Sequence, residues 1–268
     1  MKKCPLTPEG GIDLRCTILE FRIFLCRFQI GLDFVFDFGF DFVFFPIFEA
    51  MKTILLHPSY FPSVEQMAAV AQAEKVVFEV EDNYQKQTYR NRTFIAHSNG
   101  KLLLNIPIKH NRTSKRQKTK DVVVENDFPW QEQHWKSLQS AYRTSPFFEY
   151  YEDDLEHLFT EPVGNLTEYN LKIFDLLCEL IGIEVEVSKT TSYETNPEIT
   201  DLRYLIDAKR TSNFQAEVYT QVHGANHPFL PNLSVLDLLF NEGPNALGYL
   251  EKSPMPSGHH SEGENSSE

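Results

Sequence analysis

The sequence has 268 residues, a formal net charge of −13 at pH 7 and an isoelectric point of about 5.2. Because like charges repel, this acidic balance argues against general binding to nucleic acids or to anionic membranes. Three of the four cysteines lie in the first 50 residues, which leaves Cys178 alone in the remainder and excludes an internal disulfide there. We therefore expect a cytoplasmic, reducing environment.

The first 50 residues contain an unusual repeat, DFVFDFGFDFVFF, from Asp33 to Phe45. Phenylalanine occupies every even position from 34 to 44, as in a half-buried strand, and the recurring aspartates exclude a membrane helix. A T-rich simple repeat of DNA would encode the same peptide without selection for folding. Because a good first strand follows directly after Met51, we expect residues 1–50 to be a non-native, disordered extension from an over-extended gene start. The alternative is a genuine aromatic β-arm, which would aggregate readily if left unpaired.

The rest of the chain has the composition of one globular domain. Residues 51–268 hold 20 Lys and Arg against 31 Asp and Glu, and they are numerous enough to bury a sizeable core. We expect a single α/β domain over residues 51–252, with a mixed β-sheet that opens with a βαβ unit and with a helix-rich second half. Residues 253–268 are polar and lack periodicity, so we expect them to form a disordered tail.

The first half of this domain predicts a βαβ unit followed by a hairpin. Ser63 and Gln66 form a capping-box pattern for a helix that ends near Ala73, and the apolar runs on either side predict two parallel strands. The turn Ser98-Asn99-Gly100 predicts the hairpin. The strands expected in this half cover residues 53–57, 76–80, 93–96, 102–108 and 121–126.

The second half is expected to be mostly helical, because apolar residues recur there with helical spacing. Asn165 with Glu168 forms another capping box, and Gly182 is suited to end the same helix. The expected helices cover residues 131–143, 148–158, 165–182 and 234–240, and the expected short strands cover residues 184–187 and 216–221.

No motif of high specificity is present: the sequence lacks a P-loop, a glycine-rich dinucleotide fingerprint, an HExxH motif and a G-x-S-x-G elbow. No metal site is predicted, and no cofactor is identified. The segment HPSYFP, from His57 to Pro62, follows the first strand, at the place where open α/β sheets bind ligands. His57 is therefore a candidate catalytic acid or base, and Tyr60 a candidate substrate-binding residue. In the structural alternative, the same two residues cap the strand end and pack the loop.

Two basic segments could bind an anionic group. In YRNR, which ends at Arg92, a guanidinium could bind a carboxylate or phosphate through two hydrogen bonds. The run from Lys109 to Lys120 has six basic residues, of which Lys115 and Lys118 are candidates for binding a phosphate. The commoner alternatives are a surface arginine without such a role and a solvated, mobile loop. A third group is interpreted as surface charge: Asp201, Arg203 and Asp207.

Several segments together resemble the WbqC-like family of bacterial proteins. They are HPSYFP, YRNRTFI, LLLNIPIKH, the W-x₃-H-W-x₆-Y spacing that begins at Trp130, and PNLSVLDLLFNEGP near the end. The resemblance covers residues 52–250, and PNLSVLDLLFNEGP is its most specific piece. The family is largely uncharacterised, and family members begin just before the first strand, at a position like Met51.

Individual residues of this sequence match positions of the family's patterns. The matches to the family's opening pattern H-Q-P-x-Y-x-P-W are Pro58, Tyr60 and Pro62. Asn91 and Arg92 match its asparagine-arginine pair, which makes both candidates for substrate binding. The sequence also departs from the pattern, because the family's histidine falls on Leu56, its glutamine on His57 and its tryptophan on Ser63. A shift of one residue along a strand turns the side chain to the opposite face. His57 would therefore face the other way from the histidine of the family pattern, which weakens the case for His57 as a catalytic residue.

The most specific piece of the resemblance predicts a helix that begins at Asn232 or Ser234. Asp237 would lie in its first turn, where a carboxylate interacts favourably with unpaired backbone N–H groups. On this interpretation the helix closes the core. The alternative is that Asp237 faces a cleft, pairs with Arg92 and binds substrate.

Some family members lie among genes for O-antigen and surface-polysaccharide synthesis. The resemblance therefore suggests a transferase-type enzyme that acts on a phosphate- or carboxylate-bearing substrate. The alternative is a non-catalytic binding or assembly protein that uses the same cleft. The enzyme would take a small-molecule ligand, whereas the binding or assembly protein would use the cleft for a partner. We expect no nucleic acid and no membrane span, and the oligomeric state is left open.

Overall fold

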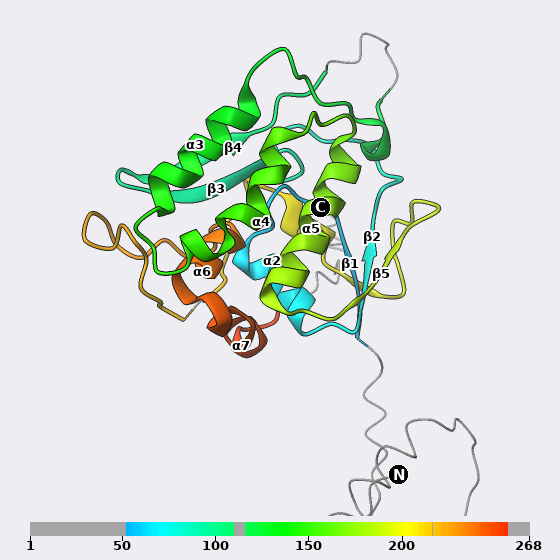
Figure 1. Cartoon of the computed structure of the whole chain (residues 1–268). Helices are drawn as coiled ribbons and strands as arrows, with labels where there is room; N and C mark the ends of the chain where they lie inside the picture. Colours follow the sequence, from blue (N-terminus) through cyan, green and yellow to red (C-terminus); the bar gives the residue numbers. More distant parts are fainter. Residues whose placement is uncertain (1–51, 110–115, 216, 257–268) are drawn as a thin grey trace, which may run out of the picture. The chain divides into compact units, whose positions relative to one another are not determined.

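The computed structural model describes residues 52–109, 116–215 and 217–256 (Figure 1). The expected extension over residues 1–50 lies outside these ranges, as do Lys115 and most of the expected tail. Ser253, where that tail was expected to begin, is described: it follows the last helix, and its carbonyl accepts a hydrogen bond of 2.9 Å from the Gln72 side chain.

The described part has the predicted α/β fold, with the elements labelled in Figure 1. The strands are β1 (Thr53–Leu56), β2 (Lys75–Phe78), β3 (Arg92–His97), β4 (Gly100–Asn105), β5 (Glu186–Lys189) and β6 (Thr200–Asp201). The α-helices are α2 (Val64–Ala71), α3 (Trp130–Tyr142), α4 (Phe148–Thr160), α5 (Leu166–Ile181), α6 (Val235–Glu242) and α7 (Ala246–Lys252). Three short 3-10 turns are η1 (Thr119–Asp121), η2 (Arg203–Ile206) and η3 (Gly243–Asn245).

A parallel sheet with the strand order β5-β2-β1-β6 organises the domain. β1 pairs in register with β2 along its whole length, and α2 crosses between them, which confirms the predicted βαβ unit. In the centre of the sheet, Ile54, Leu55 and Leu56 are at most 2% exposed. A parallel strand is typically buried on both faces in this way, so β1 forms part of the core.

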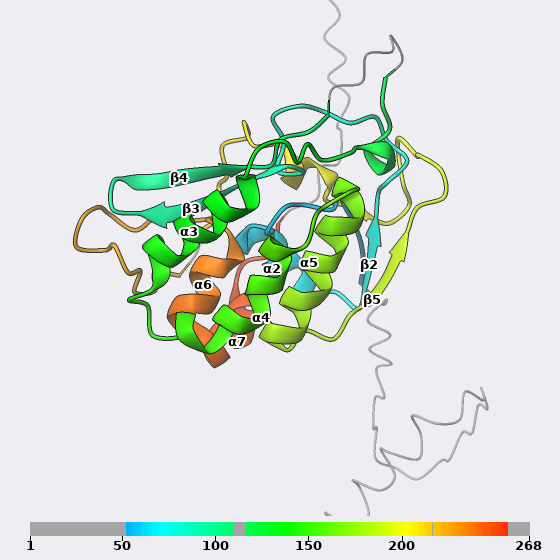
Figure 2. The ribbon, with the colours of Figure 1, turned by 45° about the horizontal axis from the view of Figure 1, so that its top comes forward.

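The hairpin is a separate two-stranded sheet of β3 and β4, paired from Arg92–Asn105 to His97–Gly100. Gly100 has a φ of +106°, a conformation that residues with a Cβ rarely adopt. β3 contacts α3 and α6, and Figure 2 shows the hairpin alongside α3. The parallel strands and the hairpin therefore lie in two sheets instead of one mixed sheet, because the hairpin packs on these helices and does not extend the edge at β6.

Local sequence signals account for the helix boundaries. The Ser63 side chain accepts a hydrogen bond from the Gln66 backbone, and Asn165 accepts one from the backbone of Glu168, as both capping boxes predict. Gly182 ends α5 in the left-handed conformation. Figure 1 shows α5 beside the parallel strands, and Phe174 of α5 packs edge-on against Phe78 of β2 at 4.9 Å between ring centroids.

Two predicted strands are wrong. The segment 121–126 forms only isolated bridges, Ile108 with Val124 and Val123 with Asn165. In the predicted strand 216–221, residues 217–221 belong to no strand. Side chains of that segment bind Asp237 of α6 instead, so this contact across the fold overrides the local strand preference.

Candidate functional site

The parallel strands bring polar residues from distant parts of the sequence to one edge of the sheet. His57 follows β1, Glu79 follows β2, Thr190 follows β5, and Asp201 ends β6. The loops beyond the carboxyl ends of parallel strands are where open α/β sheets bind ligands. The predicted position of His57 at this edge agrees with the structure.

Five buried residues at this edge form what we call the carboxyl-edge cluster: His57, Glu79, Asp82, Arg90 and Arg203. Arg90 joins two of them, because its Nη2 lies 2.6 Å from Asp82 Oδ2 and 3.0 Å from His57 Nε2. Arg203 Nη1 lies 3.7 Å from Glu79 Oε2. The two carboxylates of the cluster lie among two guanidinium groups, because buried charges require partners of opposite sign. Asp201, at the end of β6, adds a third carboxylate that binds Arg203.

The protonation of His57 follows from its partners. A guanidinium only donates hydrogen bonds, so His57 Nε2 accepts from Arg90, and Nδ1 donates to the Glu79 carbonyl at 3.3 Å. Burial, and then the charge of Arg90, hold the pKa of His57 well below its usual value. His57 is therefore neutral, and its one lone pair is engaged by Arg90 in this conformation.

The cluster contains buried polar atoms that have no hydrogen-bond partner among the described residues. They are Glu79 Oε2, Asp82 Oδ1 and Arg90 Nε. Glu79 Oε2 retains the longer ion pair with Arg203, but the other two atoms have nothing comparable. Such atoms are costly when buried, so they indicate a place where water or the polar groups of a ligand complete the network.

Arg203 is buried and not a surface charge, so that prediction is wrong. Its Nε and Nη2 bind both oxygens of Asp201 at 2.6–3.1 Å, and its remaining donors bind the carbonyls of Glu194 and Thr195. Arg203 thereby ties β6 and the preceding loop to the edge of the sheet. Asp207, the third member of the predicted group, is exposed.

Part of the basic run lies beside the carboxyl end of β2. Lys118 and Lys120 both bind the carboxylate of Glu81 at 2.6 Å, and these hydrogen bonds lower the pKa of Glu81. The backbone N–H of Tyr84 donates to the Gln117 carbonyl, which fixes this segment against the loop after β2. The predicted phosphate-binding residue Lys118 is thus close to the sheet edge and shares one carboxylate with a second lysine.

Arg92 and Arg90 are both near enough to Tyr84 to act on it electrostatically. Burial raises the pKa of Tyr84, and the two nearby positive charges oppose that rise. Arg92 is half-buried, and its Nε has no hydrogen-bond partner in the described ranges. Arg92 is therefore available to an anionic group near the carboxyl-edge cluster.

Tyr60 and Asn91 are placed away from the charged atoms of the cluster. Tyr60 is fully buried, and its hydroxyl lies 2.9 Å from Nδ1 of His134 on α3. Asn91 donates from Nδ2 to the Ile106 carbonyl at 2.9 Å and to Asn105 Oδ1 at 3.2 Å. Its own Oδ1 is buried without a partner in the described structure, and the residue lines a pocket of about 670 Å³.

Asp237 is fully buried, and it forms no ion pair with Arg92 in the described structure. Its carboxylate accepts three hydrogen bonds, at 2.9 Å from Tyr142, 2.6 Å from Tyr219 and 2.7 Å from Gln221. Burial raises the pKa of Asp237, and the three hydrogen bonds oppose that rise. The structure therefore places Asp237 in the core. Two of its partners, Tyr219 and Gln221, line a pocket formed with α7.

Comparison with known proteins assigns the family. The family model described as the WbqC-like protein family matches residues 57–213, which hold every member of the carboxyl-edge cluster. The chain belongs to the WbqC-like protein family. It is also 23% identical over 226 residues to the uncharacterised protein Rv1507c of Mycobacterium tuberculosis, covering 74% of this chain and 97% of the relative. No solved structure matches the chain.

For this WbqC-like protein, sequence reasoning missed Glu79, Asp82 and Arg90. The signal was present, because the rule that singled out His57 after the first strand applies equally to Glu79 and Asp82 after the second. In the segment YRNR the family's asparagine-arginine pair pointed to Arg92, whereas Arg90 is the arginine that binds a carboxylate. No motif spacing indicates that Arg90 would reach back to Asp82 and His57.

No helix within the described ranges has both the length and the apolar character needed to cross a membrane. Over the same ranges, His, Cys, Asp and Glu side chains do not gather in groups of three or more that could hold a metal ion.

We predict that acidification destabilises the protein through its buried histidines. Burial lowers the pKa of His134 to about 4, against 6.5 when it is unfolded. Between these values the unfolded state binds more protons, so stability is complete above pH 6.5 and declines as the pH falls towards 4. The lowered pKa of His134 alone corresponds to a loss of about 3 kcal/mol, and the lowered pKa of His57 acts in the same direction.

Urea unfolding at pH 7.0 and pH 4.5, for the native sequence and for His134→Gln, measures this effect. The variant lacks the titrating group, so its free energy of unfolding should change less between the two pH values. Carboxylates contribute equally to both proteins and cancel in the comparison. Equal pH dependence in the two proteins would contradict the lowered pKa of His134.

Proposed function

We propose that the protein is a transferase-type enzyme whose reaction takes place at the carboxyl-edge cluster, with a substrate that carries a phosphate or a carboxylate. The observation that carries this proposal is the set of buried, unpartnered atoms Glu79 Oε2, Asp82 Oδ1 and Arg90 Nε. Two acceptors and one donor match the hydroxyl or amino group that receives the transferred moiety. The proposed location is the cytoplasm.

The anionic part of the substrate would lie at the rim of the cluster. Arg92, Lys118 and Lys120 supply three positive charges there, and Glu81 supplies one negative charge. Lys115 belongs to the same basic run and is proposed to act with them. The positive excess favours a phosphate or carboxylate, and the half-buried guanidinium of Arg92 can bind one through two hydrogen bonds.

In this proposal His57 is the acid or base. While Arg90 donates to His57 Nε2, that nitrogen cannot accept a proton. A substrate anion that attracts Arg90 would release Nε2 and offset the positive charge that helps to hold the pKa of His57 down. Substrate binding would then switch on the base, which would take the proton from the receiving hydroxyl or amine.

The proposed biological role rests on the family. The genes of some WbqC-like proteins lie among genes for O-antigen synthesis. On that basis we propose a role in bacterial cell-surface polysaccharide biosynthesis. Tyr60 and Asn91 belong to the family pattern and are proposed to support the substrate site. Tyr60 would do so by packing the loop, because its hydroxyl is bonded to His134, and Asn91 by offering its unpartnered Oδ1.

Thermal melting with nucleotide sugars, amino acids and acyl carriers tests whether the site binds such substrates. A ligand at about 100 times its Kd should stabilise the protein by about 2.7 kcal/mol, which raises Tm by roughly 5–10 °C. Arg92→Gln and Lys118→Gln should each weaken binding of that ligand about tenfold. Lys136→Gln is the matched control, because Lys136 forms an exposed pair with Glu132 on α3. Equal weakening in all three variants, or none, would contradict the proposed rim.

One contact favours the non-catalytic alternative: the hydrogen bond from Arg90 that occupies His57 Nε2. Product analysis with a ligand found by melting separates the two functions. His57→Gln keeps an acceptor for Arg90 and installs the residue that the family's opening pattern has at this position. We expect this variant to retain binding and lose turnover. Binding without turnover in the native protein would instead establish the binding function.

A further inference from the structure

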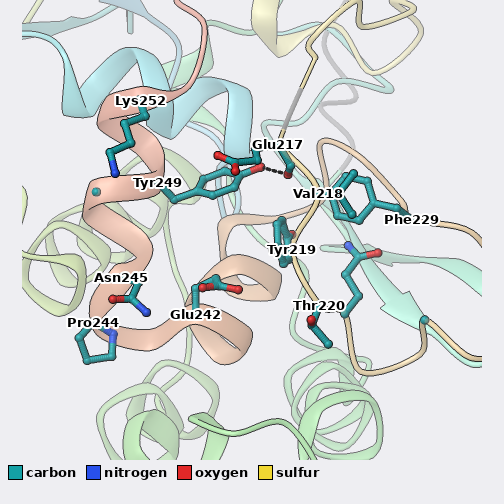
Figure 3. A pocket seen from close by; sticks show the side chains of 13 residues that line it. Glu217, Val218, Tyr219, Thr220, Phe229, Glu242, Pro244, Asn245, Tyr249 and Lys252 are labelled. Atoms are coloured by element: carbon teal, nitrogen blue, oxygen red, sulfur yellow. Dashed lines mark hydrogen bonds between the residues drawn. The ribbon is translucent and has the colours of Figure 1, made fainter.

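A second pocket, of about 850 Å³, lies between α7 and the segment 217–229 (Figure 3). The pocket and the carboxyl-edge cluster lie at opposite ends of α2. Ser63 caps the end of α2 near the carboxyl edge, whereas Gln72 at its other end binds the carbonyls of Leu250 and Ser253, at the end of α7. The function proposed above makes no use of this pocket.

Aromatic rings at right angles form a corner of the pocket. Tyr219 packs against Phe229 with 5.1 Å between ring centroids and an interplanar angle of 85°. Tyr219 also packs against Tyr249, at 5.4 Å and 87°. Figure 3 shows Tyr219 and Tyr249 on neighbouring walls, with Glu242, at the end of α6, on another side of the pocket. Both pairs are edge-to-face contacts, so the three rings form one aromatic wall of the pocket, and the π-systems of such rings attract ammonium groups.

Two carboxylates accompany these rings, and neither is held in an ion pair within the described structure. Neither Glu217 nor Glu242 forms an ion pair with another described residue. Both act electrostatically on the phenol of Tyr249, which lies in the same pocket and donates a hydrogen bond to the Glu217 backbone carbonyl. Burial, and then these two carboxylates, raise the pKa of Tyr249 to about 12. The negative charges therefore converge on the aromatic corner.

The floor of the pocket is held in place from behind by Asp237. Its buried carboxylate accepts hydrogen bonds from Tyr219 and from the nearly fully buried Gln221, at 2.6 and 2.7 Å. Gln221 also binds both backbone groups of Leu230, through its Nε2 and its Oε1. This network orients the Tyr219 ring before any ligand arrives, which lowers the entropic cost of binding.

We propose that this pocket is a binding site for a small organic cation that carries an ammonium group. The ammonium would lie in the corner of Tyr219 and Tyr249, beside the carboxylate of Glu242, where cation–π attraction and charge act together. Lys252 is exposed at the rim and repels a second positive charge, so the ligand carries a single ammonium group.

Calorimetric titration of the full chain with tetramethylammonium chloride and with n-butylammonium chloride tests the proposal, with sodium chloride as the control for ionic strength. At least one of the two ammonium ions should bind saturably at one site. Neutral tert-butanol, which resembles tetramethylammonium in shape, should bind about tenfold more weakly or not at all. Glu242→Gln removes one charge at nearly constant size and should weaken ammonium binding about tenfold.

Gly248→Leu blocks the pocket with little risk to the fold. Gly248 lines the pocket on α7, and a Cβ built there has no atom within 4 Å, while leucine is a better helix former than glycine. This variant should lose ammonium binding and keep its Tm. Glu251→Gln is the matched control, because Glu251 is an exposed carboxylate of the same helix outside the pocket lining.

The absence of saturable binding of either ammonium ion to the native protein would overturn the proposal. So would unchanged binding in both Glu242→Gln and Gly248→Leu, or equal affinity for tert-butanol and tetramethylammonium. Loss of binding in Glu251→Gln to the same extent as in Glu242→Gln would also overturn it, because the effect would then come from net charge alone.

Discussion

Replacing Arg90 with methionine should lower the free energy of unfolding by about 3–5 kcal/mol, because it breaks a buried ion pair from one side. Arg90 is 1% exposed, and Asp82, its partner at 2.6 Å, is 7% exposed. Without the guanidinium, the Asp82 carboxylate stays buried with no charge to balance it. His57 Nε2 also loses its donor, and removal of the positive charge should raise the pKa of His57.

Urea denaturation measures the loss of stability, and NMR titration of the His57 ring measures the change in its pKa. Arg143→Met is the matched control, since Arg143 is exposed and its replacement should change stability by less than about 0.5 kcal/mol. Arg90→Met combined with Asp82→Leu should recover much of the loss, because a buried pair is often replaceable by apolar residues. A loss below about 1 kcal/mol for Arg90→Met alone would mean that water reaches Asp82.

The sequence predicts those parts of the fold that depend on neighbours along the chain. The side chains of Ser63 and Asn165 cap the helices that their capping boxes indicate, and Gly182 ends α5 in the conformation that glycine favours. The βαβ unit is equally predictable, because a helix between two short apolar strands has essentially one arrangement. Each of these signals lies within a few residues of the feature that it determines.

The candidate site could be predicted only in its position. The carboxyl-end rule locates His57, but the contacts that decide its chemistry come from residues 22 and 33 positions away, Glu79 and Arg90. Asp237 shows the same difficulty more strongly. Its first-turn position suggests a simple interaction with the helix N-terminus, yet it binds Tyr142, 95 residues away, as well as the segment mistaken for a strand. Which buried polar groups meet depends on the complete packing.

Leu238→Ala should lower the free energy of unfolding by about 2–5 kcal/mol, as expected for a leucine deleted from a well-packed core. Leu238 is fully buried in α6, next to Asp237, and α6 contacts α2, α4, α7 and β3. α6 contacts both α2, which crosses between β1 and β2, and β3 of the hairpin. The cavity left by the shorter side chain would therefore lie where several elements meet. Those elements cannot all move to fill it, which favours the upper half of the range.

Leu103→Ala provides the control, because Leu103 on β4 is 41% exposed and its truncation removes far less buried apolar surface. Urea unfolding should therefore separate the two leucine variants by at least about 1.5 kcal/mol. Ammonium binding distinguishes packing from site effects, since Leu238 is absent from the pocket lining whereas its neighbour Asp237 supports the floor. If Leu238→Ala cost no more than Leu103→Ala, α6 would not be the packing element that joins the two sheets.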